Sequence, residues 1–198
     1  MYQKAKHKMF KQIASAALAA TAALVPQAAM AEQLNYMRGY RYLDNGHNEL
    51  VRALTRVGVQ VQVNVGSSCE DGSDGVYFPQ RGVLAVCQDN APRAHWSEVR
   101  WTANDLDTLR HEAVHVLQDC NAGDGLGGYT RLWFETEARR VDYVTDSLSQ
   151  DKIRWIIKSY GDGGADEFTI KAELEAFAIA ATVNPASIAR ALNNTCPA

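Results

Sequence analysis

The sequence has no excess of positive charge, which a nucleic-acid-binding surface needs. Its 20 lysines and arginines stand against 23 aspartates and glutamates, for a formal net charge of -3 at pH 7. Four of the lysines lie in the first 31 residues, which contain no acidic residue, so residues 32–198 carry a net charge of -7. We therefore expect no nucleic-acid partner. Internal repeats and low-complexity stretches are also absent, and residues 32–198 suit one domain.

No hydrophobic run is long enough for a membrane-spanning helix, which takes about 20 apolar residues. The apolar run Ile13–Val25 follows a lysine-rich start and precedes the small-residue ending Ala29-Met30-Ala31. This order is typical of a secretory signal peptide. We therefore predict a signal peptide at 1–31 and a secreted or periplasmic protein with no membrane contact after cleavage. An uncleaved membrane anchor is the alternative.

The sequence also lacks any C-x-x-C pair, which a zinc ribbon would need. Its four cysteines all lie in the predicted mature chain. An even number in an exported protein suggests two disulfides, and four cysteines allow three connectivities. We favour Cys69–Cys87, across a predicted hairpin, and Cys120–Cys196, which would tie a helix end to the C-terminus. Free buried cysteines are the alternative.

Hydrophobic periodicity divides the mature chain into a strand-rich part and a helical part. Valines alternate with glycine or polar residues over 57–65, which indicates a half-buried strand after a short helix at 45–56. Two further strands are expected at 76–78 and 83–87. Helical spacing begins near Ala103, and further helices are expected at about 130–148, 151–159, 165–182 and 185–194. We therefore predict an α+β fold, with a small antiparallel sheet followed by a helical half.

One motif in the helical half indicates a chemical function. Residues 111–115 read His-Glu-Ala-Val-His, which is an H-E-x-x-H motif. His111 and His115 are four residues apart and face the same way on a helix, so both imidazoles can bind one zinc ion. They lie nearly opposite the apolar stripe of the helix, which argues against a role in the core. Glu112 can take a proton from water that the zinc has activated. The alternative is a pair of solvated surface histidines.

A small sheet followed by a helix with this motif resembles the zincin metallopeptidases. The resemblance covers at most about a third of the mature chain. The metzincin extension is absent, because Gln118 stands where its glycine would be and no histidine follows His115. The resemblance is therefore to gluzincins such as the thermolysin-like and ImmA/IrrE-like enzymes, whose third ligand is a glutamate. It implies a zincin-like fold, Zn2+ as cofactor and a peptide or protein substrate.

Two later segments resemble the second helix of a gluzincin: E-T-E-A at 135–138 and E-L-E-A at 173–176. In the second segment, Glu173 lies on the same helix face as Ala176 and Ala180, and such small residues let a helix approach the histidine helix closely. The pattern E-x-E-A-F-A that begins at Glu173 also resembles the second helix of ImmA/IrrE-type gluzincins. As third zinc ligand we favour Glu173 over Glu135, with Glu175 and Glu137 as further alternatives.

Other residues give weaker signals. Asp119, one helical turn after His115, is expected to orient a ligand imidazole. A tyrosine is expected to donate to the developing oxyanion, with Tyr160 preferred over Tyr129 and Tyr143. The tryptophans Trp96, Trp101, Trp133 and Trp155 are expected in the core. The acidic stretch 70–75 is interpreted as an ordinary polar loop rather than a calcium site.

Together these signals predict an exported zinc-dependent hydrolase, a peptidase that cleaves amide bonds with Glu112 as general base. Glu112 and Tyr160 are its expected catalytic residues, and its expected zinc ligands are His111, His115 and Glu173. The alternative is a catalytically inert zincin-like module with a binding or structural role.

Overall fold

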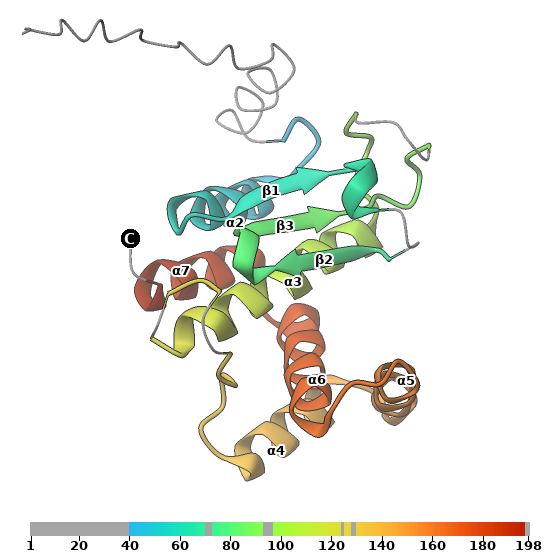
Figure 1. Ribbon diagram of the computed structural model, residues 1–198, viewed down its shortest axis with the longest axis vertical. Helices are drawn as coiled ribbons and strands as arrows, with labels where there is room; N and C mark the ends of the chain where they lie inside the picture. The colour runs from blue at the N-terminus through green and yellow to red at the C-terminus, as the bar shows by residue number, and fades with distance from the viewer. Residues whose placement is uncertain (1–39, 70–72, 93–96, 124, 128–129, 197–198) are drawn as a thin grey trace, which may run out of the picture.

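The computed structural model describes residues 40–69, 73–92, 97–123, 125–127 and 130–196. In this part of the chain a helix and three short strands precede five helices (Figure 1). The elements are α2 (Asn45–Arg56), β1 (Gln60–Val63), β2 (Gly75–Phe78), β3 (Val83–Val86), α3 (Ala103–Asn121), α4 (Glu137–Ser147), α5 (Gln150–Asp162), α6 (Glu167–Thr182) and α7 (Pro185–Thr195). The expected mixed α+β architecture is confirmed. The predicted signal peptide at 1–31 lies outside the described residues.

The three strands form one sheet in the order β1-β3-β2. β2 and β3 pair antiparallel, as expected of a hairpin, with Tyr77 opposite Leu84. β1 and β3 pair in parallel, with Val61 opposite Leu84. The prediction of an antiparallel sheet is wrong for this pair, because the valine alternation fixes the buried face of β1 and carries no information on its neighbour's direction. β2 is left as an edge strand beside α3 (Figure 1).

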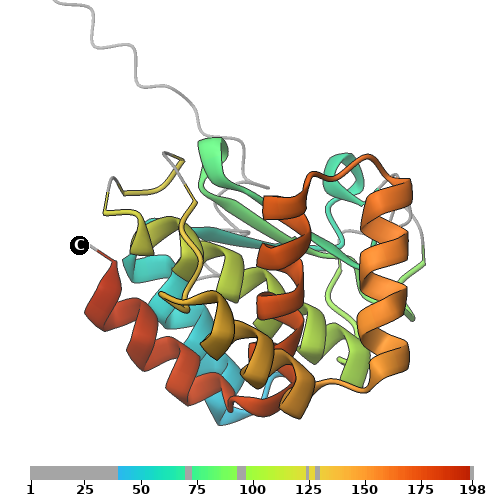
Figure 2. The ribbon, with the colours of Figure 1, turned by 90° about the horizontal axis from the view of Figure 1, so that it is seen from below.

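α3 is the central helix of the molecule. It starts with a capping box, in which the Thr102 side chain accepts from the Asp105 N–H and Asp105 accepts from the Thr102 N–H. The helix packs against β2 and β3 on one side and against α6 and α7 on the other (Figure 2). His111 is only 6% exposed. Glu173 of α6 contacts both His111 and His115, so the alternative of a solvated surface pair is wrong.

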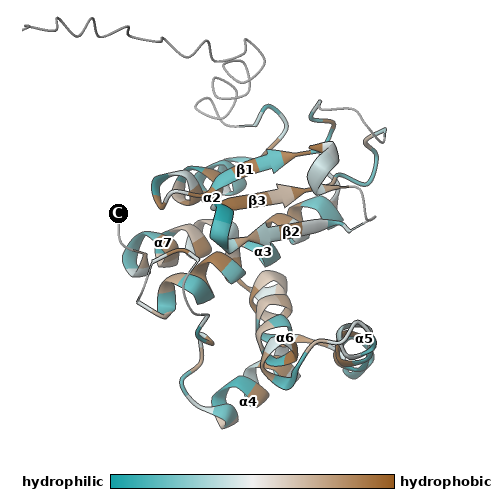
Figure 3. Cartoon of the chain, in the orientation of Figure 1, coloured by the Kyte–Doolittle hydropathy of each residue, from teal (hydrophilic) through white to brown (hydrophobic). Residues whose placement is uncertain are grey.

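α6 is the helix that faces the histidines. Its sequence is rich in alanine, and Ala172, Ala176, Ala178 and Ala180 are all buried. Figure 3 shows hydrophobic colouring on α6 where it approaches α3. Small side chains let the two helix backbones come close, which is the condition for a ligand on one helix to meet ligands on the other.

α4 is shorter than the predicted helix at 130–148. The backbone N–H groups of Trp133 and Phe134 donate to the buried carboxylate of Glu175, at 2.7 and 2.9 Å, instead of lying in a helix. Thr136 then caps the helix, which begins at Glu137. Glu135 is exposed and lies outside the helix that was expected to carry it.

All four cysteines are paired as expected. Cys69 bonds Cys87, and Cys120, near the end of α3, bonds Cys196, which directly follows α7. Disulfides of this kind persist in oxidising compartments, which is consistent with export. None of the helices in the described ranges is long and apolar enough to cross a membrane.

The tryptophans differ in their surroundings. Trp101 is buried in the core and Trp133 is partly buried against it, as expected. Trp155 is 52% exposed, so its assignment to the core is wrong. Its ring instead packs edge-on against Phe177, and the Lys152 ammonium lies 4.1 Å from its centroid. Trp96 lies outside the described residues.

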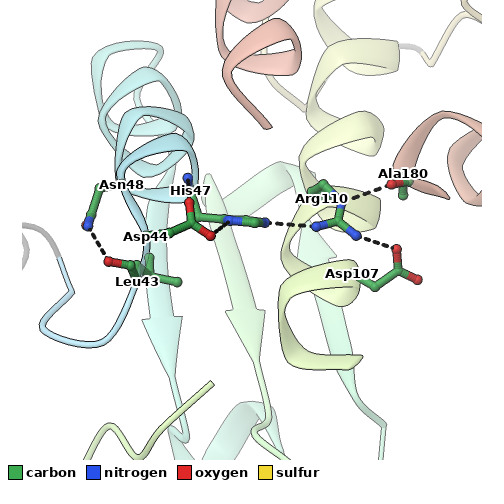
Figure 4. A network of polar contacts seen from close by, with 7 residues as sticks. All are labelled: Leu43, Asp44, His47, Asn48, Asp107, Arg110 and Ala180. Atoms are coloured by element: carbon green, nitrogen blue, oxygen red, sulfur yellow. Dashed lines mark hydrogen bonds and ion pairs between the residues drawn. The ribbon is translucent and has the colours of Figure 1, made fainter. Parts of the chain in front are cut away.

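A partly buried polar network joins α2 to α3 directly beside the H-E-x-x-H motif (Figure 4). His47 Nδ1 lies 2.7 Å from Asp44 Oδ2, and His47 Nε2 lies 2.9 Å from Arg110 Nη1. Arg110 also donates to the Ala180 carbonyl and to Asp107, both at 2.9 Å. Because Arg110 can only donate, His47 Nε2 must accept, and His47 is therefore neutral in this network.

Acid should weaken this network. Burial lowers the pKa of His47, and the nearby Arg110 charge adds to it, while Asp44 acts in the opposite direction. As the pH falls below the ordinary histidine pKa of about 6.5, the unfolded chain binds this proton more readily than the folded chain, so folding stability falls. Thermal unfolding of wild type and His47→Gln between pH 7.5 and 5 measures the effect. The difference in stability between the two proteins should shrink as the pH falls. A difference that stays constant over this range would contradict the assignment of a neutral His47.

Candidate metal centre

Two helices bring three ligand atoms together. His111 and His115 lie one turn apart on α3, and Glu173 lies on α6, which crosses α3 at this point. The two imidazole Nε2 atoms are 3.1 Å apart. Glu173 Oε2 is 3.1 Å from His111 Nε2, and Glu173 Oε1 is 3.4 Å from His115 Nε2. The structure thus brings together the three residues that the sequence analysis favoured as ligands.

These distances fit a tetrahedral zinc site. Zinc binds histidine nitrogen and carboxylate oxygen at about 2.0–2.1 Å, so two ligand atoms on a tetrahedron are separated by about 3.3 Å. The three separations observed lie close to that value. Among the described residues, Glu173 Oε2 is buried without a hydrogen-bond partner, which is costly unless something else binds it. Imidazole and carboxylate are also the ligand types that zinc takes in catalytic sites.

The charges of the three residues are strongly coupled. Burial disfavours the ionised form of Glu173, but its close contacts with His111 and His115 and the charges of the two imidazoles hold its pKa well below the usual range. Burial likewise favours neutral His115, but its hydrogen bond to Glu173 and the charges of Glu173 and Glu112 raise its pKa to about 9. Metal binding to His115 must therefore displace a proton, which makes metal affinity depend on pH.

Glu112 lies beside the ligands without joining them. Its side chain is buried, and this burial raises its pKa, with Glu173 adding to the effect and the two histidines opposing it. The backbone N–H of Tyr77, on the edge strand β2, donates to its carboxylate. A carboxylate with a raised pKa is suited to accept a proton near neutral pH.

A cavity of about 350 Å³ opens at this cluster. One wall is formed by the edge strand β2 and by Pro79, which follows β2 in the chain, and the opposite wall is formed by α3, α5 and α6. The lining residues are Gly75, Val76, Tyr77, Pro79, His111, Glu112, His115, Asp119, Thr130, Tyr160 and Glu173. The candidate ligands, Glu112 and Tyr160 therefore face one common space.

Gly75 allows β2 to approach α3 at this cavity. A Cβ at this position would lie 2.4 Å from Thr108 Cγ2 and 3.2 Å from Glu112 Cγ. The β-branched Thr108 on a helix has little freedom to move.

We expect Gly75→Ala to push β2 away from α3 and to lower the free energy of unfolding by about 1–3 kcal/mol, the usual cost of overpacking. Gly66→Ala is the matched control, because no atom lies within 4 Å of the added Cβ. Denaturant unfolding of both variants measures the difference, and equal effects would show that the close approach at Gly75 is unimportant.

Tyr160, the tyrosine preferred as hydrogen-bond donor, lies on α5 and lines the cavity. Its hydroxyl is within hydrogen-bonding reach of Glu173, and burial, followed by the Glu173 charge, raises its pKa, so it stays protonated. Tyr143 instead shares a hydrogen bond with Thr182 and does not line the cavity. Tyr129 lies outside the described residues.

The alternative third ligands lie elsewhere. Glu135 is exposed, and Glu137 forms ion pairs with Arg140 and Lys171 at the start of α4. Glu175 is fully buried, but its carboxylate is turned to the backbone of Trp133 and Phe134. Only Glu173 of the four candidates joins the two histidines.

The expected role of Asp119 is wrong. Its carboxylate accepts from the Tyr77 hydroxyl, on β2, at 3.0 Å and from the Gly127 N–H, in the segment after α3, at 2.8 Å. Gln118 contacts the ligand imidazole instead, with its Oε1 2.9 Å from His115 Nδ1. Sequence reasoning missed Gln118 and Tyr77. The spacing of three residues between His115 and Gln118 on one helix was a usable signal for the first.

Residues 40–196 match the model of a family described as a domain of unknown function (DUF8637), so the chain belongs to that family. No curated protein and no solved structure matches the chain. The family description assigns no activity, and the argument for function therefore depends on the chemistry of the site.

Proposed function

We propose that the protein is an exported zinc-dependent hydrolase of the gluzincin type that cleaves amide bonds in peptides. The observation that carries the proposal is the convergence of His111, His115 and Glu173 in one cavity, with Glu112 beside them. Three protein ligands leave a fourth position open, which is the arrangement of catalytic rather than structural zinc sites.

Each residue then has a defined task. His111, His115 and Glu173 would hold the zinc ion. Zinc in this position supplies Lewis acidity, which lowers the pKa of water and polarises a carbonyl. Glu112 takes a proton from the attacking water and passes it to the leaving nitrogen. Tyr160 donates a hydrogen bond to the carbonyl oxygen as negative charge develops on it.

The edge strand favours a peptide substrate. Among the described residues, β2 pairs with a strand on one side only, where it meets β3, and its residues Gly75, Val76 and Tyr77 line the cavity. An extended peptide can lie beside such a strand, which would bring one of its carbonyl groups to the ligand cluster.

Metal analysis of the purified mature protein tests the first half of the proposal. We expect about one zinc ion per chain, which a chelator removes with a fall in thermal stability, since the metal binds only the folded protein. A protein that neither contains zinc nor takes it up when supplied would contradict the proposal.

A further inference from the structure

Three polar side chains form a chain of hydrogen bonds behind the candidate metal centre. His115 Nδ1 lies 2.9 Å from Gln118 Oε1, on the opposite side of the ring from the ligand cluster. Gln118 Nε2 donates to Glu175 Oε2 at 2.8 Å. Gln118 and Glu175 are both fully buried, so water cannot replace these contacts. We call His115, Gln118 and Glu175 the positioning relay.

The donors and acceptors of the relay can be arranged in one way only. Besides Glu175, Gln118 Nε2 also donates to the Ala172 carbonyl at 3.1 Å. Both partners are acceptors, because the Glu175 carboxylate itself accepts from the backbone N–H groups of Trp133 and Phe134. The amide nitrogen of Gln118 must therefore face Glu175, and its oxygen must face His115.

The amide orientation fixes the protonation of His115. Since Gln118 Oε1 can only accept, His115 Nδ1 must carry a proton and donate it. The lone pair of the neutral ring is then on Nε2, which is the atom that lies 3.1 Å from His111 Nε2 and 3.4 Å from Glu173. The relay thus presents the correct nitrogen to the ligand cluster.

We propose that Gln118 and Glu175 are positioning residues for the candidate metal centre, in which Glu175 fixes the amide of Gln118 and Gln118 fixes the tautomer and ring orientation of His115. The inference rests on the proposed function in that it takes the ligand cluster to bind zinc. Partners of this kind, which hold a ligand imidazole from behind, typically alter metal affinity 10–100-fold (about one to two orders of magnitude).

The other histidine is held differently. Within the described residues, His111 Nδ1 is buried and has no hydrogen-bond partner. Its ring packs against Phe177, with the ring centroids 4.2 Å apart. Packing can fix the plane of the ring but does not select a tautomer, so the relay acts on His115 alone.

Glu175 also connects the relay to the polypeptide beyond α3. The same carboxylate holds the backbone of Trp133 and Phe134, just before α4. α6 therefore supplies both a ligand, Glu173, and the end of the relay, Glu175, while α3 supplies His115 and Gln118. A small shift of α6 against α3 would alter ligand and relay together.

Zinc affinity of the mature protein, measured by competition with a chromophoric chelator, tests the relay. Gln118→Met keeps the volume and removes both contacts, and should raise the zinc Kd about 10–100-fold. Glu175→Gln should do the same, because its new NH2 group replaces an oxygen that accepts from N–H donors. If the Gln118 amide turns over in response, its nitrogen faces His115 and the proton of the neutral ring must move to Nε2.

Two further measurements separate positioning from mere stability. Ile188→Ala removes a buried side chain on α7 and should lower the melting temperature but change the zinc Kd less than about 2-fold. Nitrogen NMR of the zinc-loaded wild type should show a proton on His115 Nδ1, and this result does not depend on any variant folding.

The outcomes are distinguishable. Unchanged zinc affinity in both folded relay variants, or an unprotonated His115 Nδ1 in the zinc-loaded wild type, would overturn the relay while leaving the proposed hydrolase standing. A wild type that takes up no zinc would overturn both. Zinc binding that depends on the relay, together with no hydrolysis, would retain the relay and reject the hydrolase.

Discussion

Replacing Glu112 with glutamine should lower the rate of peptide hydrolysis by about 10²–10⁴-fold or more, the usual contribution of a positioned general base. The amide oxygen of the new side chain can still accept from the Tyr77 N–H, so the local fold should survive. The amide cannot take a proton from water. Since Glu112 is not one of the three clustered ligands, the variant should retain zinc.

The assay incubates wild type with a mixed peptide pool, identifies the products by mass spectrometry and compares rates on those peptides. Glu135→Gln is the matched control, because Glu135 is exposed and does not line the cavity. An equal rate for wild type and Glu112→Gln would reject the hydrolase. A zinc-binding protein with no hydrolysis at all would favour the inert binding or structural module.

Replacing Glu173 with glutamine should weaken zinc binding by about 100-fold or more, beyond the 10–100-fold typical of partners behind a ligand. The variant loses the charged oxygen ligand that lies 3.1 and 3.4 Å from the two histidines. It should also lower the pKa of His115, because the carboxylate that raises it is gone.

The same control, Glu135→Gln, should leave zinc affinity unchanged. Chelator competition at fixed pH gives both affinities, and histidine NMR of the zinc-free protein gives the pKa of His115. A larger loss of zinc in Glu135→Gln than in Glu173→Gln would move the third ligand to the segment before α4 and contradict the geometry described above.

The sequence was sufficient for the parts of the site that follow from local spacing. His111 and His115 share a face because they are four residues apart on a helix. Glu173 could be favoured because the alanines beside it allow close helix packing, and the cysteine pairs could be favoured among three connectivities from their places near a hairpin and a helix end. In these two cases the local pattern narrowed the choice of partners, and the contacts between distant segments decided it.

The remaining features depend on contacts between distant segments. In the sequence, Glu175 cannot be distinguished from an exposed glutamate on a helix. Its buried role follows from the backbone N–H groups of Trp133 and Phe134, which donate to it. The parallel pairing of β1 with β3 depends on where the chain returns after β2. Neither is encoded in a short window of sequence, because the partner residues lie far along the chain.

The disulfide between Cys120 and Cys196 bears on how the protein withstands proteolysis. It closes a loop that contains α4, α5, α6 and α7, and hence both Tyr160 and Glu173. A single cut in the backbone between α3 and α4 would give two fragments that remain covalently joined at the end of the histidine helix. A chain that a protease nicks there therefore keeps the segment that carries Glu173 joined to the one that carries His111 and His115.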